Sequence, residues 1–534
     1  MRIDIKIFLI MVKNNTSQLV SPIEGRFKRR KDLTMEHRLS IAFMALMDDS
    51  WGIITKLARD YAISRTFVYM LQFQLYTAVA NEFEDKPANT LYDNKKLIIK
   101  KEAIKNALML RLVGKCSIPA TSEIMKKSGL SFSSVGSISQ VLNQIGSELS
   151  GVIAPLEGQT LYVHLASDEV FAHSRPILIS ADPISSAILN IEMAESRKTS
   201  TWINHFNQLK DSGVNIIKVV SDEGTGLRSA TSELNISRQP DTFHAISLRL
   251  GKWVNCLENA AYAKIDKEYH QVDIFNSAKS EHVLHKRLNS YIQAKKDSDE
   301  AIEFHDNFKF LYNCIIEKLQ VFDKNGNPNN RLDAEQTIRI ALDFMVTFPV
   351  IKLKKAINTI YNLLDELLAY LDIAHKVTYE LTKQGIPRYV VNLFSLGWQY
   401  EKNQTKAKNI FRNNYYNQKK KEVSGLLKAI LKDKYELTKL MVYSKLDTII
   451  QSSAIVENIN SIIRDFLNTS RNHMQKNMLN LIMFYHNHRR YRSGKRKGKT
   501  PMELLTGQTQ ELDWIDLLFQ DVSVVQLDLS TSQQ

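Results

Sequence analysis

The pattern of apolar and polar positions changes twice along the chain. Residues 34–150 show the three-and-four spacing of amphipathic helices, and residues 258–450 show it again. Between them, short apolar runs separated by turn residues predict strands. The predicted order is strand 160–171, strand 175–183, strand 186–194, helix 199–213 and strand 214–227. We therefore expect a mixed α/β domain followed by a long all-helical region.

Two stretches of the first helical region predict helix-turn-helix units. In residues 52–75, a turn at 62–64 separates two helices, and in residues 117–145 a turn at Gly129 does the same. The second helix of such a unit enters the major groove, so both stretches predict DNA binding, although any small three-helix bundle produces the same pattern. The residues that open the first of these recognition helices are Arg65, Thr66 and Tyr69.

The later helical region is expected to form a helical domain of its own. Residues 356–371 predict one continuous helix, because seven apolar side chains recur in register. The polar stretches 323–330 and 383–388 predict breaks between helical hairpins.

Charge and cysteine content narrow the class of partner. Lys and Arg number 71 against 57 Asp and Glu, a net charge of +14 that favours an anionic partner, nucleic acid first. No run approaches the roughly 18 apolar residues that span a bilayer, so no membrane partner is expected. Cys116, Cys256 and Cys314 lie far apart, which suggests neither a disulfide framework nor a zinc ribbon and favours a reducing cytosol. Residues 1–32, with a basic cluster at 26–31, are expected to be a flexible extension.

Residues 452–468 pose a question about one glutamate. They have the spacing of an amphipathic helix with a buried stripe, yet Glu457 lies in the most apolar stretch. At about 100° per residue, Glu457 shares a face with Asn460 and Arg464. An ion pair between Glu457 and Arg464 explains this placement, and so does a carboxylate held at a functional site.

Two carboxylates on the predicted strands favour the second explanation. Asp168 lies on the first strand and Asp222 at the carboxyl end of the fourth, where adjacent strands bring them together and a helix across the sheet edge adds Glu457. Like charges so close repel unless cations neutralise them. Hard oxygen ligands select Mg²⁺ or Mn²⁺, and two such ions about 3.5–4 Å apart activate a water or 3′-hydroxyl and stabilise the departing oxygen of a phosphodiester. The three acids are the predicted catalytic residues and metal ligands.

Other acids compete for these positions. Glu169 falls on the opposite sheet face from the first acid, and Asp182 ends the second strand before a proline, which suits a turn. Asp241 and His244 lie one helical turn apart, where they would orient the site or the scissile phosphate, or form a structural hydrogen bond. Rivals for the third acid, none with Asn and Arg neighbours like those at 460 and 464, are Glu258, Glu317 and Glu366.

A basic segment follows the Glu457 helix. Seven of the eleven residues 489–499 are Lys or Arg and are expected to hold a DNA strand electrostatically, with Arg464 beside them. These seven are Arg489, Arg490, Arg492, Lys495, Arg496, Lys497 and Lys499. Thr500 and Glu503 then form a predicted capping box with a proline at the first helical position.

Three other side chains have weaker claims. His486 and His488 are two residues apart, which is wrong for a zinc pair on a helix, so they are interpreted as polar-face or phosphate contacts. Trp398 is interpreted as a core residue, with base stacking as the alternative.

Together these motifs resemble the DDE-type transposases of bacterial insertion sequences. Asp168 in ASDEVF and Asp222 in VVSDEGTGL match the family's first two acids, and SAIVENIN matches the helix that carries its glutamate. FYHNHRRYRSGKRKGKTPMELLTG resembles the basic segment and Pro-x-Glu-Leu-Leu ending that commonly follow. The resemblance covers roughly 160–257 and 451–507, and it departs from the simplest cores because Asp222 and Glu457 lie 235 positions apart.

The resemblance implies a fold and a domain order. The fold is an α/β ribonuclease-H-like catalytic core with a mixed sheet, interrupted by a large all-α insertion and preceded by helix-turn-helix domains. The implied parts are an extension 1–32, two helix-turn-helix units 33–150, the first part of the core 151–257, the insertion 258–450, the final core helix and basic segment 451–510, and a tail 511–534. The acidic and apolar tail is expected to be a docking or oligomer segment.

The implied function is DNA transposition. Such an enzyme binds the terminal repeats of a mobile element, cleaves a strand with two Mg²⁺ or Mn²⁺ ions in each active site, and joins the 3′-hydroxyl to target DNA. Its expected partners are double-stranded DNA and further copies of itself, as a homodimer or larger synaptic assembly, in the nucleoid of a bacterial cytoplasm. The alternatives are a catalytically inactive, domesticated DNA-binding regulator and a structure-specific nuclease with the same core.

Overall fold

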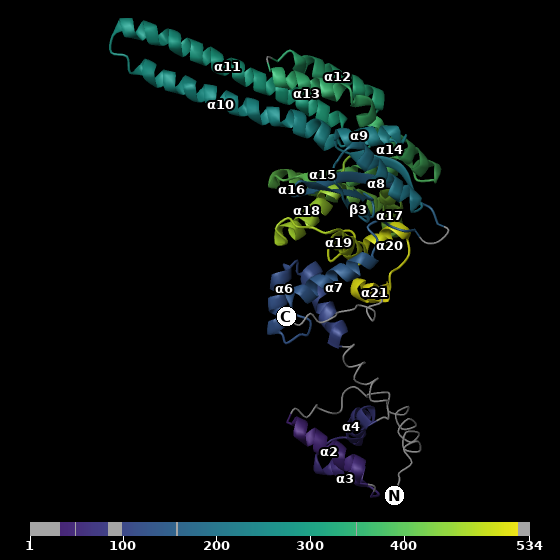
Figure 1. The fold of residues 1–534 in the computed structure, drawn as a ribbon. Coiled ribbons are helices and arrows are strands. Elements are labelled where there is room, and N and C mark those ends of the chain that lie inside the picture. The colour runs from purple at the N-terminus through teal and green to yellow at the C-terminus, as the bar shows by residue number, and fades with distance from the viewer. Residues whose placement is uncertain (1–31, 49, 84–98, 156–158, 349, 522–534) are drawn as a thin grey trace. The chain divides into compact units, whose positions relative to one another are not determined.

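The computed structural model describes residues 32–48, 50–83, 99–155, 159–348 and 350–521 (Figure 1). The chain divides into two compact units, Met1–Ile99 and Lys100–Gln534, so the boundary falls between the two stretches that predict helix-turn-helix units. The predicted extension 1–32 lies almost wholly outside the described residues.

In its described residues the first unit is a small bundle of three helices. Its elements are α2 (Met35–Met47), α3 (Ile53–Asp60) and α4 (Arg65–Phe83). The side chain of Thr34 caps α2 by accepting from the backbone N–H of His37, and Ser64 accepts from the N–H of Phe67 at the start of α4. Ile41, Leu57 and Val68 are among the residues of its core. The helices and turn lie where 52–75 predicts them, with Arg65 as the first residue of α4, while DNA binding by this unit stays a prediction.

The second unit is built around a five-stranded mixed sheet. The strands are β1 (Leu161–Ala172), β2 (Arg175–Ala181), β3 (Ile188–Met193), β4 (Val214–Ser221) and β5 (Arg238–Pro240), with α8 (Thr199–Asp211) and α9 (Thr225–Glu233) between them. Their spatial order is β3-β2-β1-β4-β5, with the β1, β2 and β3 pairings antiparallel and the β1–β4 and β4–β5 pairings parallel. The predicted strand order is confirmed, and the arrangement is consistent with a ribonuclease-H-like core.

Helices from both ends of the unit share one apolar core with this sheet. They include α6 (Ile118–Lys127), α7 (Val135–Glu148), α18 (Ala454–Thr469), α19 (Lys476–His488) and α21 (Trp514–Asp521), with the π-helical turn η1 (Met109–Val113) and the short helix α20 (Pro501–Thr506). The described part of the predicted docking tail therefore packs on its own chain, because Trp514, Ile515 and Leu518 are buried in this core.

Helix α7, which the sequence predicts as a recognition helix, packs against α19. A side chain at Gly146 would lie 2.1 Å from the backbone oxygen of Asn477, so the two helices approach as closely as a glycine permits. Asn480 donates from Nδ2 to the carbonyl oxygens of Gly146 and Leu149. One face of α7 thus belongs to the core of the second unit.

The insertion between β5 and α18 is mainly helical in its described residues, as predicted, and has a separate core. Its helices are α10 (Leu248–Asn276), α11 (Glu281–Lys318), α12 (Arg331–Val346), α13 (Ile351–Tyr361), α14 (Leu364–Lys383), α15 (Arg388–Lys406), α16 (Ile410–Leu431) and α17 (Tyr435–Leu446), with the short turns η2 (Phe243–Ser247) and η3 (Lys432–Lys434). The breaks at 323–330 and 383–388 are confirmed.

Two details of the insertion differ from expectation. The continuous helix predicted at 356–371 is wrong, because the chain breaks at Asn362 and Leu363 between α13 and α14 while its apolar side chains stay buried. Helix α10 begins inside the stretch assigned to the sheet domain.

No helix among the described residues is long and apolar enough to cross a membrane.

Candidate active site

The sheet places Asp168 and Asp222 side by side. Ser167 of β1 pairs with Ser221 of β4 in parallel register, so Asp168 on β1 and Asp222 directly after β4 are neighbours. The Oδ1 atom of Asp222 accepts from the backbone N–H of Gly224 at 2.8 Å, which fixes the carboxylate at the point where β4 ends. Two of the three predicted acids therefore share one edge of the sheet.

Asp168 is held in surroundings that oppose its negative charge. Burial is the main cause that raises its pKa to about 6, and the negative charges of Asp222 and Glu169 raise the pKa further. The backbone N–H of Glu169 and the charge of His244 act in the opposite direction. A nearby cation would relieve this electrostatic cost.

Helix α18 brings a third polar group to the same place. Asn460 is buried, and its Nδ2 donates to Oδ2 of Asp168 at 2.7 Å. The Oδ1 atom of Asn460 is also buried and has no hydrogen-bond partner in the described part of the chain. Residues 292 positions apart in the sequence thus meet through one hydrogen bond.

Glu457 lies on the same helix, one turn before Asn460, but it is paired with histidine. Its Oε1 lies 2.7 Å from Nε2 of His244, and the glutamate side chain is 48% exposed. Burial alone would lower the pKa of His244, but the hydrogen bond to Glu457 and the charges of Asp241, Glu457 and Asp222 outweigh it and raise the pKa. The ion pair suggested between Glu457 and Arg464 is not the one observed, because His244 occupies that role and Arg464 is exposed.

Asp241 links the two parts of the site. Its backbone N–H donates to the carbonyl of Ser221 at the end of β4. Its Oδ1 accepts from the N–H groups of Phe243 and His244, and its Oδ2 accepts from the N–H and hydroxyl of Ser453. Because Ser453 is the N-cap of α18, one buried carboxylate positions both His244 and the helix that carries Glu457.

Arg238 is a buried residue of the site that the sequence did not indicate. It donates to the carbonyl oxygen of Asp222 at 2.9 Å, to Glu223 at 2.6 Å and to Glu366 of α14 at 2.9 Å. Its partners lie up to 128 positions away, so no local pattern marks it. Glu366, a rival for the third acid, thereby has a structural partner.

Three of the other four rival acids are also paired or capped. Glu169 accepts from Arg197 at 2.9 Å, and Glu317 pairs with Lys324 at 3.0 Å. Asp182 accepts from the N–H and hydroxyl of Ser185, which confirms its role in the turn.

The atoms available at this site are of the chemical type that a hard divalent cation prefers. The carboxylates of Asp168 and Asp222 and the free Oδ1 of Asn460 are oxygen donors, which Mg²⁺ and Mn²⁺ prefer. Among the residues that the structure describes, no three His, Cys, Asp or Glu side chains are grouped so as to hold a metal ion. Glu457 is held by His244, outside such a group.

The basic segment is partly structural. Arg490 donates to both carboxylate oxygens of Glu503, whose capping box with Thr500 is confirmed. Arg496 donates to the carbonyl oxygen of Ile184 at 2.5 Å. Lys495 pairs with Asp447 at 2.9 Å, and Arg489 lies over the ring of Tyr485. The exposed basic residues of the segment that make no such contact with the described parts of the chain are Arg492, Lys497 and Lys499.

The structure shows the surroundings of His486, His488 and Trp398. The interpretation of His486 as a polar-face residue is wrong, because it is buried, its ring bonds the carbonyl of Ser186, and burial lowers its pKa to about 4. His488 lies 2.8 Å from Gln510. Trp398 is a buried core residue whose Nε1 donates to Asp447, as the core interpretation predicts.

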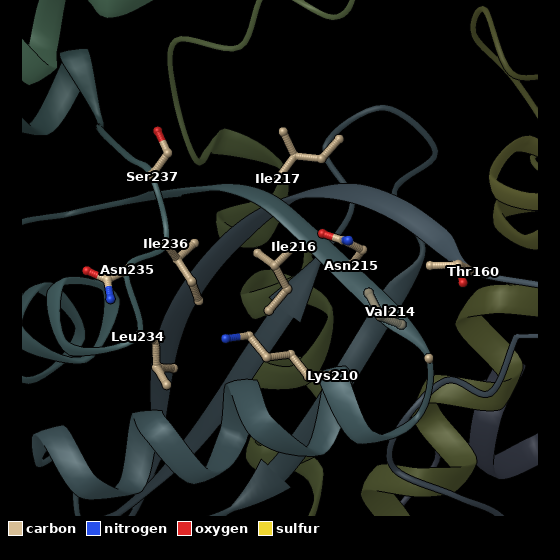
Figure 2. A pocket seen from close by; sticks show the side chains of 11 residues that line it. Thr160, Lys210, Val214, Asn215, Ile216, Ile217, Leu234, Asn235, Ile236 and Ser237 are labelled. Carbon is tan, nitrogen blue, oxygen red and sulfur yellow. The ribbon is translucent and has the colours of Figure 1, made fainter.

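A pocket of about 630 Å³ lies at the opposite end of β4 from Asp222 (Figure 2). It is lined by Lys210 of α8, Asn215 and Ile217 of β4, and Asn235 and Ser237 of the segment before β5. Lys210 is its one charged side chain, and it contains none of the predicted site residues. The pocket is therefore separate from the carboxylates.

Comparisons with known proteins add one structural likeness. No family model and no curated protein matches the chain. Among solved structures, it is similar to one titled "Drosophila P element transposase strand transfer complex", with 16% sequence identity and a TM-score of 0.27 over 56% of this chain and 86% of that chain. A likeness with so low a TM-score carries no weight for function.

Proposed function

We propose that this protein is a DNA transposase with a ribonuclease-H-like core, which cleaves a DNA strand and joins the resulting 3′-hydroxyl to target DNA. The observation that supports this most is the meeting of Asp168 and Asp222 at one sheet edge with Asn460 of α18 bonded to Asp168. A net charge of +14 and the three-helix first unit agree with double-stranded DNA as the partner.

The residues of the chain have separate tasks in this mechanism. Asp168, Asp222 and Glu457 are the proposed ligands, with Asn460 orienting Asp168 and His244 holding Glu457. Two Mg²⁺ or Mn²⁺ ions held by these residues would supply activation of the attacking water or 3′-hydroxyl and charge stabilisation of the departing oxygen. For this role Glu457 would have to release His244, and the two side chains are partly exposed, 48% and 30% respectively.

DNA is held by groups outside the carboxylates. In the first unit, Arg65, Thr66 and Tyr69 at the start of α4 are proposed to contact the element ends. In the second unit, Arg464 and the exposed residues Arg492, Lys497 and Lys499 are proposed to contact phosphates near the site.

A DNA-binding relative that no longer cuts is the second candidate function. The pairing of Glu457 with His244 favours it, since the third carboxylate then serves a structural purpose. Both candidates predict DNA binding, so only catalysis separates them.

The test is a strand-cleavage and joining assay with labelled duplexes that carry the repeats flanking the gene. Wild-type protein with Mg²⁺ should release a 3′-hydroxyl end and join it to a second duplex, whereas Asp222→Asn should bind the duplex equally well and do neither. Binding without cleavage by wild type would favour the inactive relative, and cleavage without joining would identify a nuclease.

A further inference from the structure

The side chain of Asn460 is buried with one end of its amide unpaired. Val456, Ile459 and Ile463 around it are buried in the core shared with the sheet, so packing fixes this part of α18. Asn460 itself is 1% exposed, and its Oδ1 has no hydrogen-bond partner in the described part of the chain. Buried polar atoms in native proteins almost always have a partner, so this oxygen calls for a water, an ion or a functional role.

The unpaired oxygen leaves the amide of Asn460 free to turn. A half turn about the Cβ–Cγ bond exchanges Oδ1 with Nδ2, because the two ends of an asparagine amide have nearly the same shape. Among the described residues, only the hydrogen bond from Nδ2 to Asp168 opposes this turn, since no donor holds Oδ1 in its place. The same side chain can therefore present either a donor or an acceptor to Asp168.

The charge next to the amide decides which end faces Asp168. An ionised carboxylate attracts an N–H donor, which explains the observed contact of Nδ2 with Oδ2 of Asp168. A cation on the carboxylate reverses this preference, because it repels the N–H group and attracts the amide oxygen. Carbonyl oxygens are ordinary ligands of hard divalent cations. A cation on Asp168 therefore favours the turned amide.

A neutral ligand also balances the charge of the site. Asp168 and Asp222, when ionised, carry two negative charges, which one Mg²⁺ or Mn²⁺ neutralises. The amide oxygen of Asn460 adds a ligand without adding a charge, whereas a third carboxylate leaves one negative charge in excess. Glu457 already has a partner, because its Oε1 lies 2.7 Å from Nε2 of His244.

We infer that Asn460 is a direct ligand of the cation that Asp168 and Asp222 hold, with its amide oxygen turned toward Asp168. The inference deepens the proposed function and rests on it for the identity of the cation, Mg²⁺ or Mn²⁺. In protein without DNA, Asn460 is the third protein ligand and Glu457 stays paired with His244.

The first test compares a hard and a soft cation in full-length protein without DNA. Isothermal titration calorimetry gives the dissociation constants of Mn²⁺ and Cd²⁺ for wild type, Asn460→Cys and Asn458→Cys. Because a thiolate prefers the softer ion, Asn460→Cys should shift the ratio of the two constants toward Cd²⁺ by at least about tenfold. Asn458→Cys is the matched control, since Asn458 lies on the same helix but is exposed. An equal shift in both variants, or none, would contradict the inference.

The second test needs no substitution in the protein that carries the signal. Wild-type protein labelled with a magnetic carbon isotope at the asparagine Cγ is loaded with Mn²⁺ and measured by electron–nuclear double resonance. A strongly coupled carbon should appear, and it should be missing from Asn460→Ala, whose fold circular dichroism checks. A spectrum without this coupling would leave a water as the partner of Oδ1 and overturn the inference. So would a coupling that persists in Asn460→Ala.

These measurements separate the inference from the proposed function. If Mn²⁺ couples to Asn460 in a protein that neither cleaves nor joins DNA, the inference stands and the proposed function fails. If the protein cleaves and joins DNA while Mn²⁺ shows no coupling to Asn460, only the inference fails. Wild-type protein that binds no Mn²⁺ in the absence of DNA would also overturn the inference.

Discussion

The candidate site has two halves of different origin. Asp168 and Asp222 come from strands of one continuous stretch, and their proximity follows from the parallel register of β1 and β4. Asn460 and Glu457 come from α18, which the chain reaches only after the whole helical insertion. The first half is built into the sheet, whereas the second packs on the sheet through the shared apolar core and a few long-range hydrogen bonds.

This difference shows where the site is vulnerable. The sheet half is supported by backbone hydrogen bonds on both sides of β1, which do not depend on the insertion. The α18 half depends on Asp241, Asn460 and His244, each of which makes a contact across more than 200 positions of sequence. Substitutions in the two halves should therefore fail in different ways.

The largest expected effect is on catalysis by Glu457. If both halves are needed, Glu457→Gln should reduce the rate of strand cleavage by about 10³-fold or more, as removal of an essential catalytic group does. Its unfolding free energy should change little, because the side chain is 48% exposed. Glu366→Gln is the control, and equal losses in both variants would show that the third acid has been misassigned.

The next effect tests the attachment of α18. Asp241→Asn removes the negative charge of a buried carboxylate that accepts hydrogen bonds from Ser453, Phe243 and His244. The substitution should lower the free energy of unfolding by about 2–4 kcal/mol. Urea unfolding measures this loss. Cleavage should also fall in protein that remains folded, since Glu457 is displaced.

Asp182→Asn is the matched control for Asp241. Asp182 is a buried acid that accepts two hydrogen bonds in a turn of the same sheet, but its side chain bonds Ser185 and not α18 among the described residues. The control should lose stability and keep its cleavage rate per folded molecule. A normal cleavage rate in folded Asp241→Asn would contradict the positioning role of Asp241.

A smaller effect concerns the charge of Asp168 in metal-free protein. Burial raises its pKa from 3.8 to about 6, so the stability that it contributes is complete below pH 3.8 and is lost as the pH rises through 6. With EDTA present, Asp168→Asn should therefore be more stable than wild type at pH 8, by roughly 1–2 kcal/mol. The difference should shrink to nothing near pH 4, and an unchanged difference across this range would refute the assignment.

The smallest effect concerns residues outside both halves. Lys499→Gln removes one exposed charge of the basic segment and should lower the slope of log affinity for DNA against log salt concentration by about 1. Lys352→Gln removes an exposed charge from α13 and should leave the slope unchanged. Fluorescence anisotropy at several salt concentrations compares the two.

Much of the sheet half follows from local pattern. Alternation and turn residues predicted the strands and their order, and the end of β4 located Asp222, because strand periodicity depends on adjacent residues alone. Helix boundaries were less accurate. The break between α13 and α14 leaves the apolar register intact, so periodicity does not reveal it.

The partners of individual side chains were predicted less well. His486 lies on a helix next to charged residues, yet packing on β3 buries it. Arg490 belongs to a run of basic residues that resembles a DNA-binding segment, yet it stabilises the capping box through Glu503. A basic side chain is the same residue whether it faces solvent or packs inside the protein. Its role depends on the residues that surround it in the folded structure.

The sequence by itself determined the element order, the excess of positive charge and the candidate acids, since these depend on composition and on neighbours along the chain. The tertiary structure alone decided that Asn460 bonds Asp168 and that His244 holds Glu457. It also decided that Asp241 joins α18 to the sheet and that Arg238 joins the insertion to it. These contacts close loops of about 130 to 290 residues. Their formation depends on how separately folded elements pack, which no short-range pattern encodes.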